Sequence, residues 1–181
     1  MQWDERIYQE HCRWMEYALQ LATEAGEAGE IPVGAVIVDD HGAIVGEGNN
    51  RKERDRLPTA HAEMIAINQA AQRRGNWHLN DLRLYVTLEP CPMCSGAIIQ
   101  ARLGTLVYGA DDPKTGAVRS VLNLPDSAAS NHHLTVIGGV LNQACRQQLK
   151  QWFAEKRPKI QSIALRARQE ACMQEAKVSY R

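Results

Sequence analysis

Two short motifs about thirty residues apart constrain this chain more than any other feature. The first holds His61 and Glu63, and the second holds Cys91 and Cys94 directly after Pro90. One imidazole and two thiolates are donors that zinc prefers, and catalytic zinc sites commonly keep three protein ligands and one open position. A chain that uses these donors together must fold so that the two motifs meet.

The residues after each motif are largely apolar, which predicts that each motif opens a helix. Residues two apart do not share a helix face, so His61 and Glu63 can approach one ion only near a helix N-terminus. Cys91 and Cys94 are three apart and share a face, and Pro92 is acceptable in a first helical turn. A helix N-terminus also favours thiolates over thiols.

The combined pattern is typical of zinc-dependent nucleobase deaminases. As a carboxylate outside the ligand set, Glu63 is suited to carry the proton from water to a ring nitrogen and to help the amine leave. We therefore expect hydrolytic deamination with release of ammonia, with His61, Cys91 and Cys94 holding one Zn²⁺ per subunit. A redox interpretation of the two cysteines would leave His61 and Glu63 without a role.

The chain has 181 residues, of which 44% are hydrophobic and 23% charged, as is ordinary for one globular domain. Its first thirty residues contain neither a signal-peptide pattern nor a membrane span, so we expect a cytoplasmic protein without a membrane partner. The other cysteines lack metal spacing and are interpreted as structural thiols; they are Cys12, Cys145 and Cys172.

Charge is distributed unevenly although the formal net charge is zero. Residues 1–30 carry seven acidic and two basic residues, whereas residues 150–181 carry eight basic and three acidic ones. The basic end suits contact with phosphates, and a solvated charged helix explains it equally well. We divide the chain into a deaminase domain at 1–160 and a basic helical extension at 161–181.

Alternating helical and strand patterns predict an α/β fold with a mixed sheet of about five strands and helices on both faces. Strands are expected at 33–38, 43–48, 84–87, 106–108 and 134–137. Helices are expected at 8–28, from 61, from 91 and from about 142.

Four segments resemble the bacterial tRNA-specific adenosine deaminases, and the resemblance runs from about residue 8 to 160. They are Ile31–Val36, Pro58–Glu63, Thr87–Cys94 and Tyr108–Gly116. Cytidine, deoxycytidylate and guanine deaminases share the metal signature. The tRNA branch is favoured by three further features, which are Lys114–Gly116, Asn131–His132 and the aromatic pair Trp152–Phe153.

The resemblance implies a three-layer α/β/α cytidine-deaminase-like fold and a homodimer. It also implies conversion of the wobble adenosine to inosine in the anticodon loop of an arginine tRNA. By the same resemblance, Asn50 hydrogen-bonds the flipped nucleotide, Ala62 offers its backbone amide to the base, and Glu89 helps to form the pocket. The positions expected to contact the anticodon loop are Asp112, Lys114, Asn131, His132 and Phe153.

Several of these residues also have simpler interpretations. Asn50 suits a turn, Lys114 a solvated loop, and Phe153 the core side of an amphipathic helix. Two departures from the family bear on RNA affinity: Lys52 lies where the family commonly has proline after an asparagine–arginine pair, and Asp111 lies where a basic residue is frequent.

Two alternative functions remain open from the sequence. A deaminase of a free base or nucleoside, of the guanine or cytosine type, needs the same zinc chemistry without an extended RNA surface. A zinc-stabilised RNA-binding subunit without turnover needs the metal for folding and has no use for Glu63.

Overall fold

The computed structural model describes residues 4–156, which form one five-stranded sheet in the order β2-β1-β3-β4-β5. The strands are β1 (Gly34–Val38), β2 (Ile44–Asn49), β3 (Arg83–Leu88), β4 (Thr105–Ala110) and β5 (Thr135–Gly138). β1 pairs antiparallel with both β2 and β3, whereas β3, β4 and β5 pair parallel. The sheet is therefore mixed, as predicted.

This topology gives the sheet two unlike ends. Every strand except β1 runs in the same direction, so the carboxyl ends of β2, β3 and β4 lie at the edge where β1 begins. In α/β folds, ligands commonly bind in the crevice beyond the carboxyl ends of strands. Residues that follow β2, β3 and β4 are thereby brought to one place.

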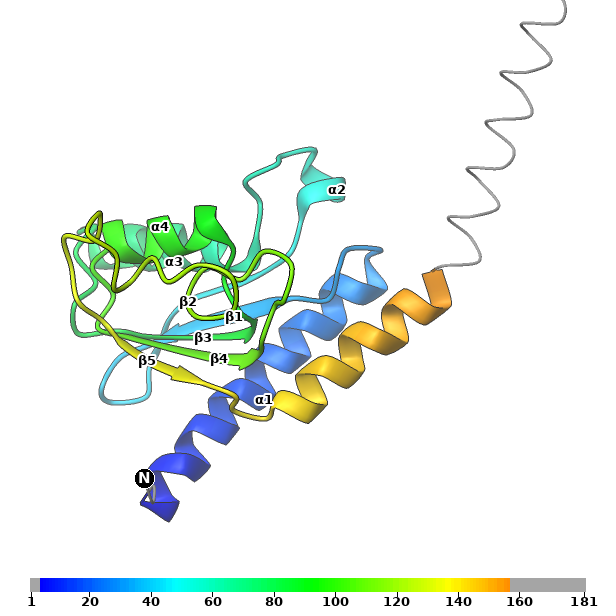
Figure 1. Cartoon of the computed structure of the whole chain (residues 1–181), viewed down its shortest axis with the longest axis horizontal. Helices are drawn as coiled ribbons and strands as arrows, with labels where there is room; N and C mark the ends of the chain where they lie inside the picture. Colours follow the sequence, from blue (N-terminus) through cyan, green and yellow to red (C-terminus); the bar gives the residue numbers. More distant parts are fainter. Residues whose placement is uncertain (1–3, 157–181) are drawn as a thin grey trace, which may run out of the picture.

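Helices cover both faces of the sheet, as Figure 1 shows. α1 (Glu5–Glu27) and a helix at 142–156, coloured yellow to orange, lie side by side on one face, and α3 (Ala62–Arg74) and α4 (Pro92–Gln100) lie on the other. A single turn of helix, α2 (Lys52–Asp55), stands beyond the end of β2. The arrangement confirms the expected three-layer α/β/α architecture.

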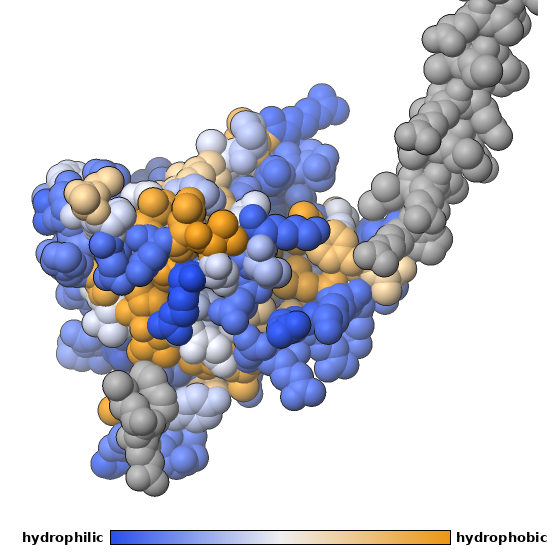
Figure 2. Space-filling view, viewed as in Figure 1, coloured by the Kyte–Doolittle hydropathy of each residue, from blue (hydrophilic) through white to orange (hydrophobic). Residues whose placement is uncertain are grey.

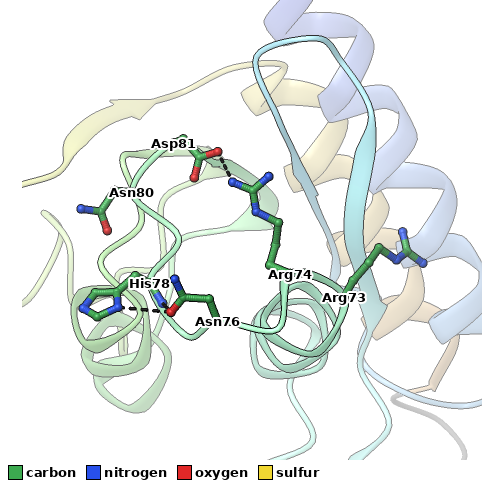
Figure 3. Close-up of a pocket in the computed structure, with 6 residues that line it drawn as sticks. All are labelled: Arg73, Arg74, Asn76, His78, Asn80 and Asp81. Atoms are coloured by element: carbon green, nitrogen blue, oxygen red, sulfur yellow. Dashed lines mark hydrogen bonds and ion pairs between the residues drawn. The ribbon is translucent and has the colours of Figure 1, made fainter.

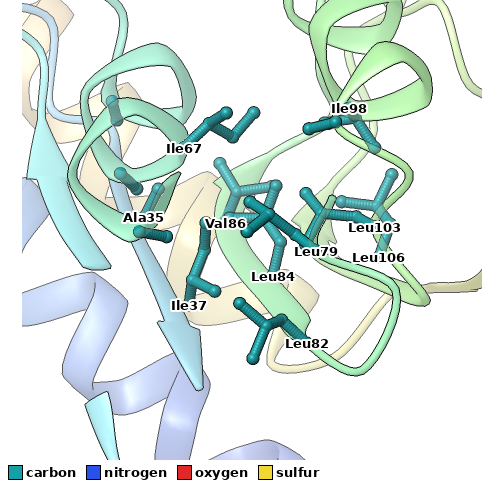
Figure 4. Close-up of a cluster of buried hydrophobic side chains, with 14 of the residues drawn as sticks. Ala35, Ile37, Ile67, Leu79, Leu82, Leu84, Val86, Ile98, Leu103 and Leu106 are labelled. Atoms are coloured by element: carbon teal, nitrogen blue, oxygen red, sulfur yellow. The ribbon is translucent and has the colours of Figure 1, made fainter. Parts of the chain in front are cut away.

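The central strands alternate their side chains between two hydrophobic cores, because successive residues of a strand point to opposite faces. In β1, Ala35 and Ile37 join the core beneath α3 and α4 (Figure 4), and Val36 and Val38 join the core beneath α1. β3 and β4 alternate in the same way. A strand buried on both faces reads as a continuous apolar run, which explains the sequence of β1.

The observed elements extend the predicted ones at several ends. α1 begins at Glu5 rather than residue 8, because the Asp4 side chain caps it by accepting a hydrogen bond from the Arg6 amide at 2.9 Å. α2 was not predicted, since its sequence has no apolar periodicity. The predicted extension at 161–181 lies outside the described residues. No described helix has the length and apolarity to span a bilayer.

α3 packs unusually close to β2 because two glycines face it. A Cβ atom at Gly46 would overlap the carbonyl oxygen of Ala66, and one at Gly48 would overlap that of Ala62. The missing side chains let the first two turns of α3, which carry the His61 motif, lie directly on the strand.

We expect Gly46→Ala to lower the free energy of unfolding by about 1–3 kcal/mol, because backbone atoms must shift to admit the methyl group. Urea denaturation measures the change. Gly96→Ala in α4 is the matched control, since its Cβ meets nothing within 4 Å and glycine in a helix interior costs roughly 0.5–1 kcal/mol against alanine. Equal destabilisation by both changes would contradict the close-packing argument.

Candidate metal centre and its pocket

The two motifs occupy equivalent positions in the fold. His61 is the N-cap of α3, with φ −81° and ψ 153°, and Cys91 is the N-cap of α4, with φ −71° and ψ 172°. Pro92 takes the first helical position of α4, where its missing N–H costs nothing. Both helices therefore point their N-termini at the same place, which was the geometric condition for one shared ion.

The structure brings the three predicted metal ligands together. His61 Nδ1 lies 3.5 Å from Cys94 Sγ and 3.8 Å from Cys91 Sγ, and all three donor atoms lie within 4.8 Å of one another. Cys94 is fully buried, and the other two are half-buried. One nitrogen and two sulfur donors at this spacing fit a tetrahedral zinc ion that keeps one position open.

The electrostatics of the cluster also fit a cation. The neighbouring Cys94 thiol lowers the pKa of Cys91 to about 4, and His61 assists by hydrogen bonding. The Cys91 hydrogen bond, burial and the Glu63 charge raise the pKa of Cys94 far above its usual range. A divalent ion lets both sulfurs ionise, and its binding then releases protons.

Glu63 is the second residue of α3 and lies beside the ligands, with only 4% of its surface exposed. Burial raises the pKa of its carboxyl above the ordinary value, and His61 opposes that shift. A buried carboxyl with a raised pKa beside a set of metal ligands is chemically suited to exchange protons with a bound molecule.

A cavity of about 170 Å³ opens onto His61, Glu63 and Cys91. It is lined by residues from four points at one edge of the sheet, which are Ile31 and Val33 before β1, Asn50 and Lys52 after β2, Leu88 and Glu89 at the end of β3, and Asp112 and Thr115 after β4. The cavity is smaller than the roughly 300–1,000 Å³ of most drug-sized sites, so it suits a single planar ring system.

A larger hollow of about 720 Å³ lies at the other end of α3, and Figure 3 shows why it is a weaker candidate. Arg74 is paired with Asp81, His78 is bonded to Asn76 at 3.2 Å, and Arg73 points away from the others. Its polar groups thus largely satisfy one another.

Asn50 and Ala62 are bonded to each other. The Asn50 Oδ1 atom accepts a hydrogen bond from the Ala62 amide at 3.1 Å, and its Nδ2 atom donates to the Ile31 carbonyl at 3.0 Å. Both groups were expected to contact the base, whereas in this structure the Ala62 amide donates its hydrogen bond to the Asn50 side chain. The Asn50 side chain ties the end of β2 to the start of α3 and to the residues before β1.

Glu89 organises the loop that follows β4. Its buried carboxylate accepts hydrogen bonds from five donors, which are the amides of Asp112, Val118, Arg119 and Ser120 and the Ser120 hydroxyl. Burial alone would raise the pKa of Glu89, but these hydrogen bonds outweigh burial and hold the pKa below its usual value. Glu89 thus both lines the cavity and fixes the cavity wall.

The remaining predicted residues lie outside the cavity, except Asp112. The Asp112 carboxylate accepts hydrogen bonds from the Lys114 amide and the Thr115 hydroxyl, so it shapes its own loop. Lys114 is exposed on that loop. Phe153 is 42% exposed beside Trp152, at a centroid distance of 5.1 Å, so it is not a core residue.

Asn131 and His132 lie at the opposite end of the sheet. The His132 Nε2 atom contacts the Leu103 carbonyl at 2.8 Å, just before β4 begins, and both residues precede β5. The cavity lies where β4 ends, so the structure does not bring these two residues to it.

Sequence reasoning missed Glu30, which is only 3% exposed. Its carboxylate accepts hydrogen bonds from the amides of Arg54, at 2.8 Å, and Glu53, at 3.3 Å, and thereby holds α2 beside the cavity. No signal in the sequence marks this role, because the partner amides come from a segment without a helical pattern.

Comparisons with known proteins agree with the geometry. The model of the cytidine and deoxycytidylate deaminase zinc-binding region matches residues 8–110. A tRNA-specific adenosine deaminase of Haemophilus influenzae is 49% identical over 145 residues, which cover 80% of this chain and 84% of that protein.

Solved structures give the same picture. A structure from work on A-to-I editing by tRNA:A34 deaminases at the wobble position of transfer RNA has a TM-score of 0.73 and 40% identity, covering 75% of this chain and 98% of that one. A guanine deaminase of Nitrosomonas europaea has a TM-score of 0.66 and 26% identity, covering 78% of this chain and 83% of that one.

We expect Glu89→Gln to lower the free energy of unfolding by roughly 2–3 kcal/mol at pH 7, because an amide cannot replace a carboxylate that accepts five hydrogen bonds. The folded-state pKa is lowered, so this stability is present above the ordinary value of 4.5 and is lost as the pH falls through the folded pKa. Urea unfolding at several pH values measures it.

The exposed Glu16→Gln is the control for that experiment and should change stability by less than about 0.5 kcal/mol. A Glu89→Gln deficit that stays constant from pH 7 to pH 3 would show that the ionised carboxylate is not what holds the loop.

Proposed function

Since this chain belongs to the cytidine and deoxycytidylate deaminase family, and within it to the tRNA-specific adenosine deaminases, we propose that it converts the wobble adenosine of a tRNA anticodon loop to inosine. The reaction consumes one water and releases ammonia. The observation that carries this proposal is the position of the buried Glu63 carboxyl. It lies beside three residues that can bind one metal ion, and it lines a cavity sized for one base.

His61, Cys91 and Cys94 would hold the zinc ion, one per subunit. Bound zinc would supply the Lewis acidity that lets a water molecule lose a proton near neutral pH. Glu63 accepts that proton and delivers it to a ring nitrogen of the base, and then carries the second proton of the same water to the departing amine, which leaves as ammonia. Glu63 does so without being a ligand, because the other three residues supply the donor set.

The size of the cavity supports a flipped nucleotide rather than a base read within a helix. About 170 Å³ admits the base, so the ribose, the phosphates and the neighbouring nucleotides must lie outside. An unpaired loop base also lowers the cost of extrusion. Lys114 is suited to a phosphate and the exposed Phe153 ring to stacking on an unpaired base, and both are accessible.

Asn50 and Glu89 support the same function by shaping the cavity. Asn50 keeps the starts of α3 and β1 together, and an approaching base would have to compete for its side chain or for the Ala62 amide. Asp112, in turn, positions the loop that carries Lys114. Contact of Asn131 and His132 with the RNA remains part of the proposal, outside the cavity.

The finer parts of the proposal rest on the family resemblance. They are the preference for an arginine tRNA, the homodimer and the cytoplasmic location. Deamination of a free base such as guanine is the second candidate, and it is favoured by the same small cavity, which would also admit a base without a nucleotide chain.

We expect Glu63→Gln to keep the zinc and the fold while lowering kcat by at least about a hundred-fold, because the amide cannot carry the proton. Cys94→Ala, in contrast, should lose zinc because it removes a ligand. Metal analysis, circular dichroism and single-turnover deamination separate the two effects. Full turnover by the Glu63→Gln protein would refute the mechanism and revive a zinc site that only stabilises an RNA-binding subunit.

The substrate is tested with an arginine-tRNA anticodon stem-loop that carries a wobble adenosine. We expect inosine in its digest by mass spectrometry, and no turnover of free adenosine, cytidine or guanine under the same conditions. A second stem-loop, with another tRNA sequence around the same adenosine, measures the arginine preference. Turnover of guanine alone would transfer this chain to the free-base deaminases.

A further inference from the structure

The loop after β4 has two sides, and only one of them belongs to the catalytic cavity. Asp112 and Thr115 line the cavity, whereas Asp111 and Pro113 line a second hollow of about 400 Å³. The opposite wall of that hollow is the helix at 142–156, which contributes Arg146, Leu149 and Lys150. The loop therefore forms a ridge between the two depressions, and the exposed Lys114 lies on it.

The helix at 142–156 carries two of its basic residues, Arg146 and Lys150, in a regular row of polar side chains. Asn142, Arg146 and Lys150 are four residues apart, so they lie on one face of the helix. A third hollow, of about 360 Å³, is lined by the same three residues together with Gln143 and Gln147. Arg146 and Lys150 thus stand between two adjoining depressions. Figure 2 shows hydrophilic side chains over most of this helix.

The helix that carries Arg146 and Lys150 is anchored to the sheet and to α1. Cys145 is 1% exposed and packs into the core beneath α1, and the Asn142 side chain donates to the Gly109 carbonyl of β4 at 3.3 Å. Further along the helix, Trp152 Nε1 donates to the Gly26 carbonyl at 3.2 Å. Arg146 and Lys150 are thus exposed on a helix that is anchored beside the ridge.

The positive charges on this surface are not neutralised by ion pairs within the described part of the chain. Among the ion pairs formed within residues 4–156, none involves Arg146, Lys150 or Lys114. One carboxylate, Asp111, faces the two cations across the hollow. Ala110, Pro113 and Leu149 supply the apolar part of the hollow, whereas the exposed rim carries Arg146 and Lys150 with the amide side chains of Gln143 and Gln147 beside them. Exposed cations without ion-pair partners, next to amide groups, suit the phosphates of a hydrated polyanion.

We propose that Arg146 and Lys150 bind the phosphates of the RNA strand that leaves the catalytic cavity and crosses the ridge at Lys114. This inference rests on the proposed function, because it extends the path of the same RNA. Side chains four apart on a helix are separated by about 5–6 Å at Cβ, so two long basic residues can reach neighbouring phosphates. These two residues would thereby bind the anticodon stem, outside the loop that carries the deaminated base.

The test compares the wild type with Arg146→Gln/Lys150→Gln on an anticodon stem-loop, by fluorescence anisotropy at several salt concentrations and by steady-state deamination. We expect KM and Kd to rise about ten-fold, with kcat and zinc content unchanged. The slope of log K against log salt should become shallower by about 1.4–1.8, which is the loss of two phosphate contacts at roughly 0.7–0.9 each.

A charge-matched control and a shortened RNA make the result specific. Arg6→Gln/Arg73→Gln removes two exposed charges elsewhere and should leave the slope as it is in the wild type. On an oligonucleotide that contains only the anticodon loop, the Arg146/Lys150 variant should behave like the wild type. A stem-loop slope and KM equal to the wild-type values, or an equal loss in the control variant, would overturn the proposal.

This design separates the inference from the proposed function. Inosine production by the wild type decides the function, whereas the difference in slope between wild type and variant decides the role of Arg146 and Lys150. RNA binding without deamination would leave the slope comparison intact. An absence of any RNA binding by the wild type would overturn both.

Discussion

The meeting of two helix N-termini is the constraint on which the rest of this molecule depends. His61 occupies the N-cap position of α3 and Cys91 that of α4, and their donor atoms lie within 4.8 Å of the Cys94 sulfur and of each other. Such a meeting requires that β2 and β3 end at the same edge of the sheet. The antiparallel position of β1 between them meets this requirement, and it also places the start of β1 in the cavity wall.

Buried polar side chains complete what the sheet topology begins. Asn50, Glu89 and Glu30 each satisfy backbone amides of a neighbouring segment that has no regular strand partner. A buried carboxylate or amide is costly unless its hydrogen bonds are made, so each of these residues holds its segment in one arrangement. The cavity wall is consequently built mainly from loops, yet those loops are held by bonds to the rigid strand ends.

The proposed function assigns the chemistry and the recognition of RNA to different parts of the molecule. The cavity is sized for one base, so in the proposed reaction the features that distinguish one RNA from another would be recognised outside it. Lys114 and Phe153 are exposed outside the cavity, and the RNA path that we propose continues over Arg146 and Lys150 on a helix anchored to the sheet.

The sequence by itself determined the donor set and the layered fold, and it supplied Glu63 as the candidate proton carrier. These follow from residue type and local periodicity, as the spacing of His61 and Glu63 and the apolar run of β1 illustrate. Only the tertiary structure decided that Ala62 gives its amide to Asn50 and that His132 lies at the far end of the sheet from the cavity. Those outcomes depend on contacts between segments distant in the chain, and α2 escaped prediction because its support, Glu30, comes from such a segment.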